Sequence, residues 1–251
     1  MQFGVCAGQK NSAVARAAGW DYLEDNVQGV LKGLESTWTA PTTDLPTPAA
    51  NSMVPGSVPI VGPNVSKEQL TSYMTNVLTR APQIGMKTIV FGSGGARNVP
   101  DGFDRSKAVD QITDFLHLIA PIAQKNSVTI VIEPLNRSEC NIINSVKEAM
   151  NYVKAVNHPA IQCLVDSYHF WLEDEPLANL EAAMPWIKHV HVADKDGRVA
   201  PGVSGTSDYV PFFKVLKQGG YDKLISVEGK FDWTKDAESS LKRLKDDWQS
   251  V

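Results

Sequence analysis

The strongest constraint on the fold is a regular alternation of short apolar runs with amphipathic stretches along the 251 residues. The clearest run, VTIVIE at 128–133, is rich in β-branched residues, which favour β-strands. Seven other runs share this character. The eight expected strands are 3–6, 22–24, 49–51, 88–91, 128–133, 161–166, 190–192 and 224–228.

Helical windows separate these strands. In 69–81 the apolar residues recur close to the 3.6-residue period of an α-helix. Ser145 opens another window, and Glu148 follows three residues later, which is the pattern of a capping box. The expected longer helices are 69–81, 108–124, 145–156, 211–217 and 237–248.

Strands that alternate with helices favour parallel βαβ units, and eight such units in about 250 residues match the size of a (β/α)8 TIM barrel. We therefore expect an α/β chain that forms one barrel domain over residues 1–251. A doubly wound open sheet is the competing architecture. It lacks support because no GxGxxG motif follows the first strand.

Composition narrows the class of protein. Lys and Arg total 24 and Asp and Glu total 28, so the net charge of −4 disfavours a nucleic-acid partner. The three cysteines are too few and too scattered for a disulfide framework or a structural zinc site. Neither a signal-peptide pattern nor an apolar run of about 18 residues is present. We expect a cytoplasmic protein without a membrane partner.

Four residues that suit metal binding lie at or next to the carboxyl ends of expected strands. They are Glu133, Asp166, His191 and Glu228, with spacings of 33, 25 and 37 residues. Each spacing corresponds to one βα unit. Residues at the carboxyl ends of successive barrel strands meet at the face where TIM barrels hold their active sites. The spacing therefore predicts that the four side chains converge.

Three carboxylates close together would repel one another without a cation. Two glutamates, one aspartate and one histidine form a hard, oxygen-rich ligand set. Such a set suits Mn²⁺, with Mg²⁺ or Co²⁺ as alternatives, better than metals that prefer thiolates. We expect one divalent ion, with open positions for substrate oxygens.

Four segments resemble motifs of the xylose isomerase-like sugar isomerase/epimerase superfamily. The segment VIEPLNRSECNIINSVKEAM at 131–150 is similar to its central motif. DSYH at 166–169, HVHVAD at 189–194 and SVEG at 226–229 are similar to its later motifs. Within the superfamily, the chain most resembles the D-tagatose/D-psicose 3-epimerase-like enzymes.

The resemblance implies roles for particular residues. It implies a metal ion held by Glu133, Asp166, His191 and Glu228. His169 resembles the histidine that hydrogen-bonds a substrate hydroxyl, and Glu139 resembles the glutamate that holds the O1/O2 end of the sugar. Arg198 resembles an arginine that contacts substrate oxygens, although its spacing is shifted by one residue. The resemblance also implies a small-molecule sugar substrate and a possible homo-oligomer.

The residue types indicate proton transfer next to a carbonyl group. A metal on O2 and O3 of a ketose would polarise the carbonyl and acidify the C3 proton. Glu133 and Glu228 are the expected catalytic residues, one removing the proton to give an enediolate and the other returning it on the opposite face. The expected activity is a metal-dependent sugar isomerase/epimerase that acts as a ketose 3-epimerase.

Three alternatives remain open to different degrees. The same site could serve a metal-dependent lyase or dehydratase of a keto-sugar or 3-keto-glycoside. A zinc AP endonuclease on a related barrel needs more histidines, whereas this chain has five and offers Asn51 and Gly92 at the third and fourth strand ends. A non-catalytic sugar-binding protein would have little need of Glu139 and His169.

Other residues near the expected site are assigned structural roles. We expect His189 to point to the face opposite to His191 and to pack against the helices. Glu24 is either a structural acid or a substrate contact, with neither favoured. Asp194 is either a partner of His191 or, as we favour, a loop charge.

Two loops are also conspicuous. Residues 35–64 are rich in Pro, Thr and Ser, and a loop of this length is often a functional lid. The turn GSGGAR at 92–97 is either a phosphate cradle or, as we favour, a flexible loop that leaves room for substrate.

Overall fold

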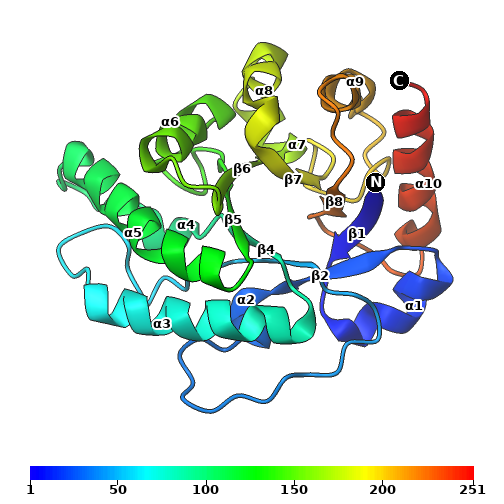
Figure 1. The fold of residues 1–251 in the computed structure, drawn as a ribbon. Helices are drawn as coiled ribbons and strands as arrows, with labels where there is room; N and C mark the ends of the chain where they lie inside the picture. Colours follow the sequence, from blue (N-terminus) through cyan, green and yellow to red (C-terminus); the bar gives the residue numbers. More distant parts are fainter.

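The computed structural model describes residues 1–251 and shows eight parallel strands that close into a barrel in chain order. Figure 1 shows the ring of strands surrounded by helices, as expected for a TIM barrel. The strands are β1 (Gln2–Cys6), β2 (Tyr22–Asn26), β3 (Ala49–Asn51), β4 (Thr88–Phe91), β5 (Thr129–Ile132), β6 (Ile161–Asp166), β7 (Ile187–Val192) and β8 (Leu224–Val227).

Ten α-helices cover the outside of the barrel or occupy its connections (Figure 1). They are α1 (Ser12–Ala17), α2 (Val27–Val30), α3 (Lys67–Arg80), α4 (Gly94–Arg97), α5 (Arg105–Lys125), α6 (Val146–Val156), α7 (Ser167–Leu172), α8 (Leu177–Ala183), α9 (Val210–Gln218) and α10 (Asp236–Gln249). None of these helices is both long enough and apolar enough to cross a membrane.

All eight expected strands and all five longer helices are present, with ends that shift by a few residues. At the start of α6, the Ser145 hydroxyl accepts a hydrogen bond from the backbone N–H of Glu148 at 3.0 Å. The Glu148 carboxylate accepts from the backbone N–H of Asn144 at 2.8 Å rather than from that of Ser145. The expected capping box is therefore only half formed. The short helices α2, α4, α7 and α8 lie in connections that the sequence pattern did not resolve.

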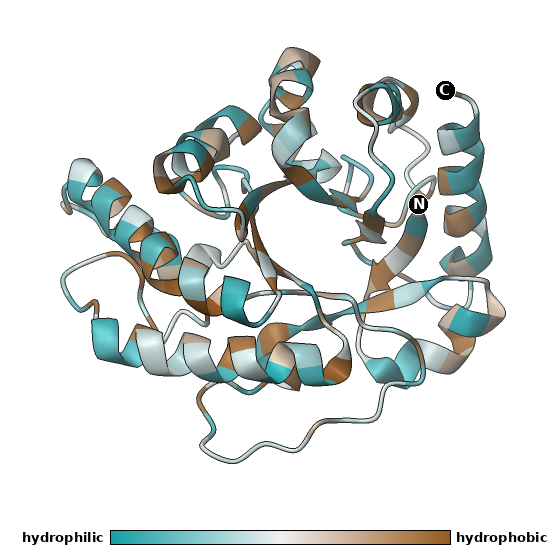
Figure 2. Ribbon diagram, in the orientation of Figure 1, coloured by the Kyte–Doolittle hydropathy of each residue, from teal (hydrophilic) through white to brown (hydrophobic).

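Apolar residues fill both the barrel and the layer between strands and helices. Figure 2 shows apolar residues on the barrel-facing side of α10 and hydrophilic residues on its outer side. Val131 and Leu164 form a small buried cluster with Val90. Val131 and Leu164 lie two residues before Glu133 and Asp166, and residues two apart on a strand share a face. The apolar cluster therefore lies on the same face of the strands as the candidate site.

The long segment 35–64 is irregular except for β3. Its second half is firmly attached to the connection after β4. The backbone N–H of Val54 donates to the Ser93 hydroxyl at 2.9 Å, and that of Ile60 donates to the carbonyl of Ala96 at 2.7 Å. Val54 and Ile60 are also buried. These contacts hold residues 52–61 against the connection that follows β4.

Candidate metal centre

The four residues expected at the strand ends lie together. One ligand atom from each of Glu133, Asp166, His191 and Glu228 falls within 4.8 Å of the others. Asp166 and His191 end or nearly end β6 and β7, while Glu133 and Glu228 each follow directly after β5 and β8. Barrel closure therefore gathers side chains that are up to 95 residues apart, as the spacing predicted.

His191 presents one ring nitrogen to the other three residues. Its Nδ1 lies 3.1 Å from Glu133 Oε1 and 3.3 Å from Glu228 Oε2. Its Nε2 lies 2.9 Å from Glu24 Oε1 on the opposite side of the ring. Because both nitrogens face carboxylates, the pKa of His191 is raised well above its usual value by Glu24 and Glu228, despite the opposing effect of burial.

Asp166 provides the clearest sign that the site suits a cation. Its Oδ1 accepts from the backbone N–H of Tyr168 at 2.9 Å and caps α7. Its buried Oδ2 has no hydrogen-bond partner, and the nearest basic side-chain nitrogens, Arg198 Nη2 and His169 Nε2, lie 3.6 Å away. A buried carboxylate oxygen without a partner is costly. A hard divalent ion among these carboxylates would satisfy it, so the donor set fits an ion of this class.

The electrostatics of the carboxylates differ from one another. Burial and then the charge of Glu228 raise the pKa of Glu133. Burial, together with the charges of Glu133 and Glu228, raises the pKa of Asp166 to about 7, although Arg198 opposes this shift. Burial would also raise the pKa of Glu228, but His191 and Arg198 lower it to about 2. Such divergent values are common at functional sites.

The Gly-rich turn after β4 makes room for the Glu133 carboxylate. A Cβ atom on Gly92 would lie 2.3 Å from Glu133 Oε2, which is far inside contact distance. Gly92, Gly94 and Gly95 also line a cavity of about 340 Å³ together with Gly56. The same cavity is lined by Glu133, Glu139, Arg198 and Glu228. The turn thus leaves space at the strand end, although residues 94–97 form the short helix α4 rather than a loop.

His169 lies beside Asp166 with a fixed orientation. Its Nδ1 accepts a hydrogen bond from the backbone N–H of Asn136 at 3.1 Å. In a neutral imidazole the other nitrogen then carries the hydrogen. Burial and then the charge of Arg198 lower the pKa of His169 to about 3, so the ring is neutral. Its Nε2, 3.6 Å from Asp166 Oδ2, is therefore a hydrogen-bond donor at the site.

Arg198 reaches into the same cluster from the connection after β7. Its Nη2 donates to Glu228 Oε2 at 2.7 Å, and its Nη1 donates to Glu139 Oε1 at 3.1 Å. The guanidinium lies 4.8 Å from the ring centroid of Tyr168. Arg198, Glu139 and His169 thus surround the four candidate ligands, and their expected roles as substrate contacts stay predictions.

The expectation for His189 was wrong. His189 and His191 are two residues apart on β7, and the period of two places such residues on the same face of a strand, not on opposite faces. The His189 Nε2 lies 2.7 Å from Glu24 Oε2, and the centroids of the two imidazole rings are 5.0 Å apart. Both histidines and Glu24 are buried, so Glu24 is part of the histidine network behind the site.

Asp194 is also not an exposed loop charge. It is fully buried, and its Oδ2 accepts from the backbone N–H and hydroxyl of Ser204 at 2.9 and 2.8 Å. Its Oδ1 accepts from the Tyr209 hydroxyl at 2.8 Å. This carboxylate therefore holds the connection between β7 and α9 in place.

Sequence reasoning missed Asn51. Its side-chain amide donates to Glu228 Oε1 at 2.8 Å, so β3 helps to orient a residue 177 positions away. An asparagine at a strand end was a signal that could have been used, since the other strand ends carry the polar site residues.

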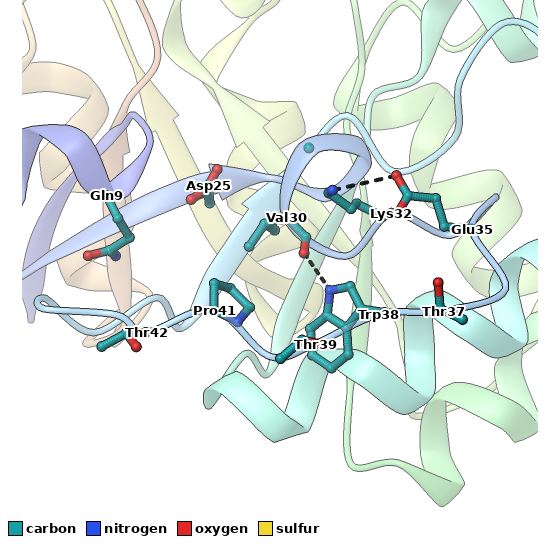
Figure 3. A pocket seen from close by; sticks show the side chains of 11 residues that line it. Gln9, Asp25, Val30, Lys32, Glu35, Thr37, Trp38, Thr39, Pro41 and Thr42 are labelled. Carbon is teal, nitrogen blue, oxygen red and sulfur yellow. Dashed lines mark hydrogen bonds and ion pairs between the residues drawn. The ribbon is translucent and has the colours of Figure 1, made fainter.

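A second, larger cavity of about 570 Å³ lies between α2 and the segment that follows it (Figure 3). Asp25 and Trp38 line it, and the Trp38 indole N–H donates to the carbonyl of Val30 at 2.8 Å. None of the four candidate ligands lines this cavity. Asp25 follows Glu24 directly, so its side chain points to the other face of β2. The chemistry is therefore assigned to the smaller cavity.

A closed parallel barrel with three carboxylates and one histidine at its strand ends defines an α/β barrel protein with a candidate metal centre. The chain belongs to the xylose isomerase-like TIM barrel family, whose sequence model matches residues 14–247. It is similar to 3-dehydro-D-guloside 4-epimerase from Escherichia coli (strain K12), with 30% identity over 161 residues, 61% of each chain. It is 25% identical to D-psicose 3-epimerase from Ruminiclostridium cellulolyticum over 66% of this chain and 57% of that one. The matches span about three fifths of these relatives.

Solved structures share the whole fold. The apo structure of 3-keto-D-glucoside 4-epimerase from E. coli has a TM-score of 0.81 at 22% identity and covers 98% of this chain and 99% of its own. D-psicose 3-epimerase in the presence of D-fructose has a TM-score of 0.82 at 14% identity, with 99% of both chains covered. A zinc-bound structure of the IolI protein has a TM-score of 0.70 at 17% identity, covering 98% and 96%.

Proposed function

We propose that the protein is a divalent-metal-dependent sugar epimerase or isomerase that moves a proton at the carbon next to a carbonyl group. The observation that carries this proposal is the convergence of Glu133, Asp166, His191 and Glu228 within 4.8 Å. The curated relatives are named as epimerases of a guloside and of a ketose, which supports the same class of reaction.

The four residues would hold Mn²⁺, with Mg²⁺ or Co²⁺ as alternatives. The ion would polarise the carbonyl and the neighbouring hydroxyl of the sugar, which acidifies the C–H proton on the carbon that carries this hydroxyl. The orphaned Asp166 Oδ2 and the hard donor set support this assignment. The IolI structure holds a zinc atom, which supports a divalent ion in this site but does not identify the metal as Mn²⁺.

Glu133 and Glu228 would transfer the proton. One carboxylate takes the C–H proton. The electron pair of that bond forms a C=C bond to the carbonyl carbon, and the carbonyl π pair moves onto its oxygen to give an enediolate. The other carboxyl group returns a proton to the same carbon from the opposite face, which inverts its configuration. On a free ketose the product is the 3-epimer.

The remaining residues would bind the sugar. The Nε2–H of His169 is oriented to donate to a substrate oxygen, since Asn136 holds the other nitrogen. Arg198 and Glu139 offer a paired donor and acceptor at the edge of the cavity. A small-molecule sugar substrate, a cytoplasmic location and a homo-oligomer belong to this proposal.

A test measures deuterium incorporation by NMR when free ketoses are incubated in D₂O with the Mn²⁺-loaded protein. We expect exchange at C3, with a loss of at least a thousandfold in Glu228→Gln, because a carboxamide cannot accept the proton. Glu181→Gln, an exposed change on α8, serves as the control and should keep full activity. Absence of exchange with every ketose and keto-glycoside tested would refute the proposal.

A keto-glycoside is a second candidate substrate. The cavity wall over Gly56, Gly94 and Gly95 carries no side chains beyond Cα, which leaves space for a substituent on the reacting sugar. A curated relative and a solved structure, both from E. coli, are named for glycoside substrates. A 3-keto-glucoside assayed beside a free ketose distinguishes the two, and release of the aglycone would indicate the lyase alternative instead.

A further inference from the structure

Behind the candidate metal centre, Glu24 connects both histidines of β7. Its Oε1 lies 2.9 Å from His191 Nε2, and its Oε2 lies 2.7 Å from His189 Nε2. The Ser226 hydroxyl donates to Oε2 at 2.6 Å and lies 2.7 Å from the Tyr22 hydroxyl. Glu24 is 1% exposed, so bulk water has little access to these partners.

The network uses both oxygens of Glu24. A group of Cys6, Glu24 and His191 also has ligand atoms within 4.8 Å of one another. However, three donors from His189, His191 and Ser226 already satisfy the Glu24 carboxylate. Hydrogen bonding therefore accounts for this cluster without a second ion.

The position of Glu24 fixes which nitrogen of His191 is free to bind a metal. A neutral imidazole has one N–H donor and one lone pair, on different nitrogens. The Glu24 carboxylate can only accept, so the nitrogen facing it, Nε2, keeps its hydrogen. Nδ1 also faces carboxylates, but these belong to the other candidate ligands Glu133 and Glu228. When the ring gives up one hydrogen to bind a metal, the Nδ1 hydrogen is therefore the one that leaves, and the lone pair lies on Nδ1.

We infer that Glu24 is a positioning residue that holds the Nε2–H of His191 and thereby presents Nδ1 as the metal ligand. This inference rests on the proposed metal-dependent function. Both oxygens of Glu24 must be hydrogen-bond acceptors, because an amide has one acceptor oxygen and would place its N–H₂ group against one of the two histidines. His189 and Ser226 fix the carboxylate in turn, so β2, β7 and β8 together set the ring orientation.

The test compares Mn²⁺ binding to the full chain and to Glu24→Gln after metal removal, by calorimetry with MnCl₂ alone. Loss of a carboxylate behind a metal-bound histidine weakens metal binding by about 10- to 100-fold. We expect a loss in this range. Glu148→Gln is the matched control, because it makes the same change at a half-buried carboxylate at the start of α6 that bonds Asn144 and Arg105 and has no contact with the four ligands. It should change the affinity less than twofold.

Two further measurements separate positioning from a general structural role. In ¹⁵N-histidine spectra of the zinc-loaded protein, His191 should carry its hydrogen on Nε2, and this signal should change in Glu24→Gln. If Glu24→Gln does not fold, Glu24→Asp takes its place in the test. The aspartate keeps the charge, but its shorter side chain no longer reaches His191, so this variant should also bind Mn²⁺ more weakly. A folded Glu24 variant with unchanged affinity would overturn the inference alone. An unsubstituted chain that binds no Mn²⁺ would overturn the proposed function as well.

Discussion

At the scale of single residues, the site depends on which atom each side chain directs toward the centre. The backbone N–H of Asn136 donates to Nδ1 of His169, so His169 directs its Nε2–H toward Asp166. Glu24 accepts from Nε2 of His191, so His191 directs its Nδ1 toward Glu133. His169 on α7 and His191 on β7 thus play opposite parts, the first as a donor and the second as a candidate ligand. Their backbone and side-chain partners, rather than their own chemistry, create this difference.

The carboxylate of Glu133 depends on the absence of a side chain at Gly92. In Gly92→Ala the new Cβ would overlap Glu133 Oε2 at 2.3 Å, so the carboxylate must move from its place among the ligands. We expect Mn²⁺ affinity, measured by calorimetry, to fall at least tenfold while the circular dichroism spectrum stays unchanged. Gly95→Ala is the control, since its Cβ would meet only Gly56 Cα at an ordinary 3.7 Å. Equal affinities in the two variants would contradict this account.

At the scale of elements, the candidate site is carried by the connections that follow the strands. The connection after β4 is anchored by Arg97, which is fully buried. Its guanidinium donates to the carbonyls of Phe91 and Glu133 at 2.7 Å each and lies 5.1 Å from the Phe91 ring centroid. One side chain therefore ties the ends of β4 and β5 together beside the candidate ligand Glu133.

Replacement of Arg97 should weaken the whole fold. Arg97→Met keeps much of the side-chain volume but leaves the buried carbonyl of Glu133 without a donor, at a cost of about 1–3 kcal/mol. It also leaves the Phe91 carbonyl with only the N–H of Glu133 at 3.2 Å, which adds the loss of one hydrogen bond, about 0.5–1.5 kcal/mol. We expect the free energy of unfolding in urea to fall by about 3 kcal/mol. Arg105→Met provides the comparison, because Arg105 is exposed and its loss should cost under about 0.5 kcal/mol. A similar small effect for both variants would show that the Arg97 anchor is not needed.

At the scale of the whole molecule, closure of the barrel forces like charges together. Strand β8 pairs with β1, which completes the ring and brings Glu228 and Glu24 to the same histidine from opposite ends of the chain. The folded state therefore bears repulsion that an unfolded chain would not feel. A divalent ion would relieve it, so ion binding and folding should be linked.

Mn²⁺ should raise the melting temperature in a pH-dependent way. At an ion concentration 100-fold above Kd, binding stabilises the fold by about 2.7 kcal/mol, or roughly 5–10 °C for a chain of this size. The pKa of Asp166 is raised to about 7, so below that pH its carboxyl group is protonated and must lose the proton to bind the ion. Calorimetric scans should show the full rise at pH 8 and a much smaller rise at pH 5.5, with EDTA abolishing both. A rise that does not depend on pH would contradict this assignment.

The sequence by itself determined the strands, the longer helices and the four strand-end residues, because periodicity and spacing are local properties of the chain. The match of 14–247 to the xylose isomerase-like TIM barrel family agrees with the resemblance of the motifs. The sequence also contained the answer for His189, because residues 189 and 191 are two apart and therefore share one face of a strand.

Only the tertiary structure decided how these residues are oriented. Glu24 meets His191 across 167 positions and Asn51 meets Glu228 across 177, contacts that no local pattern encodes. Asp194 illustrates the same limit, since a charged residue in a loop is usually exposed and only packing reveals the donors that bury it. Hydrogen-bond direction and burial depend on the whole barrel, because they arise from groups that meet only once all eight strands are paired.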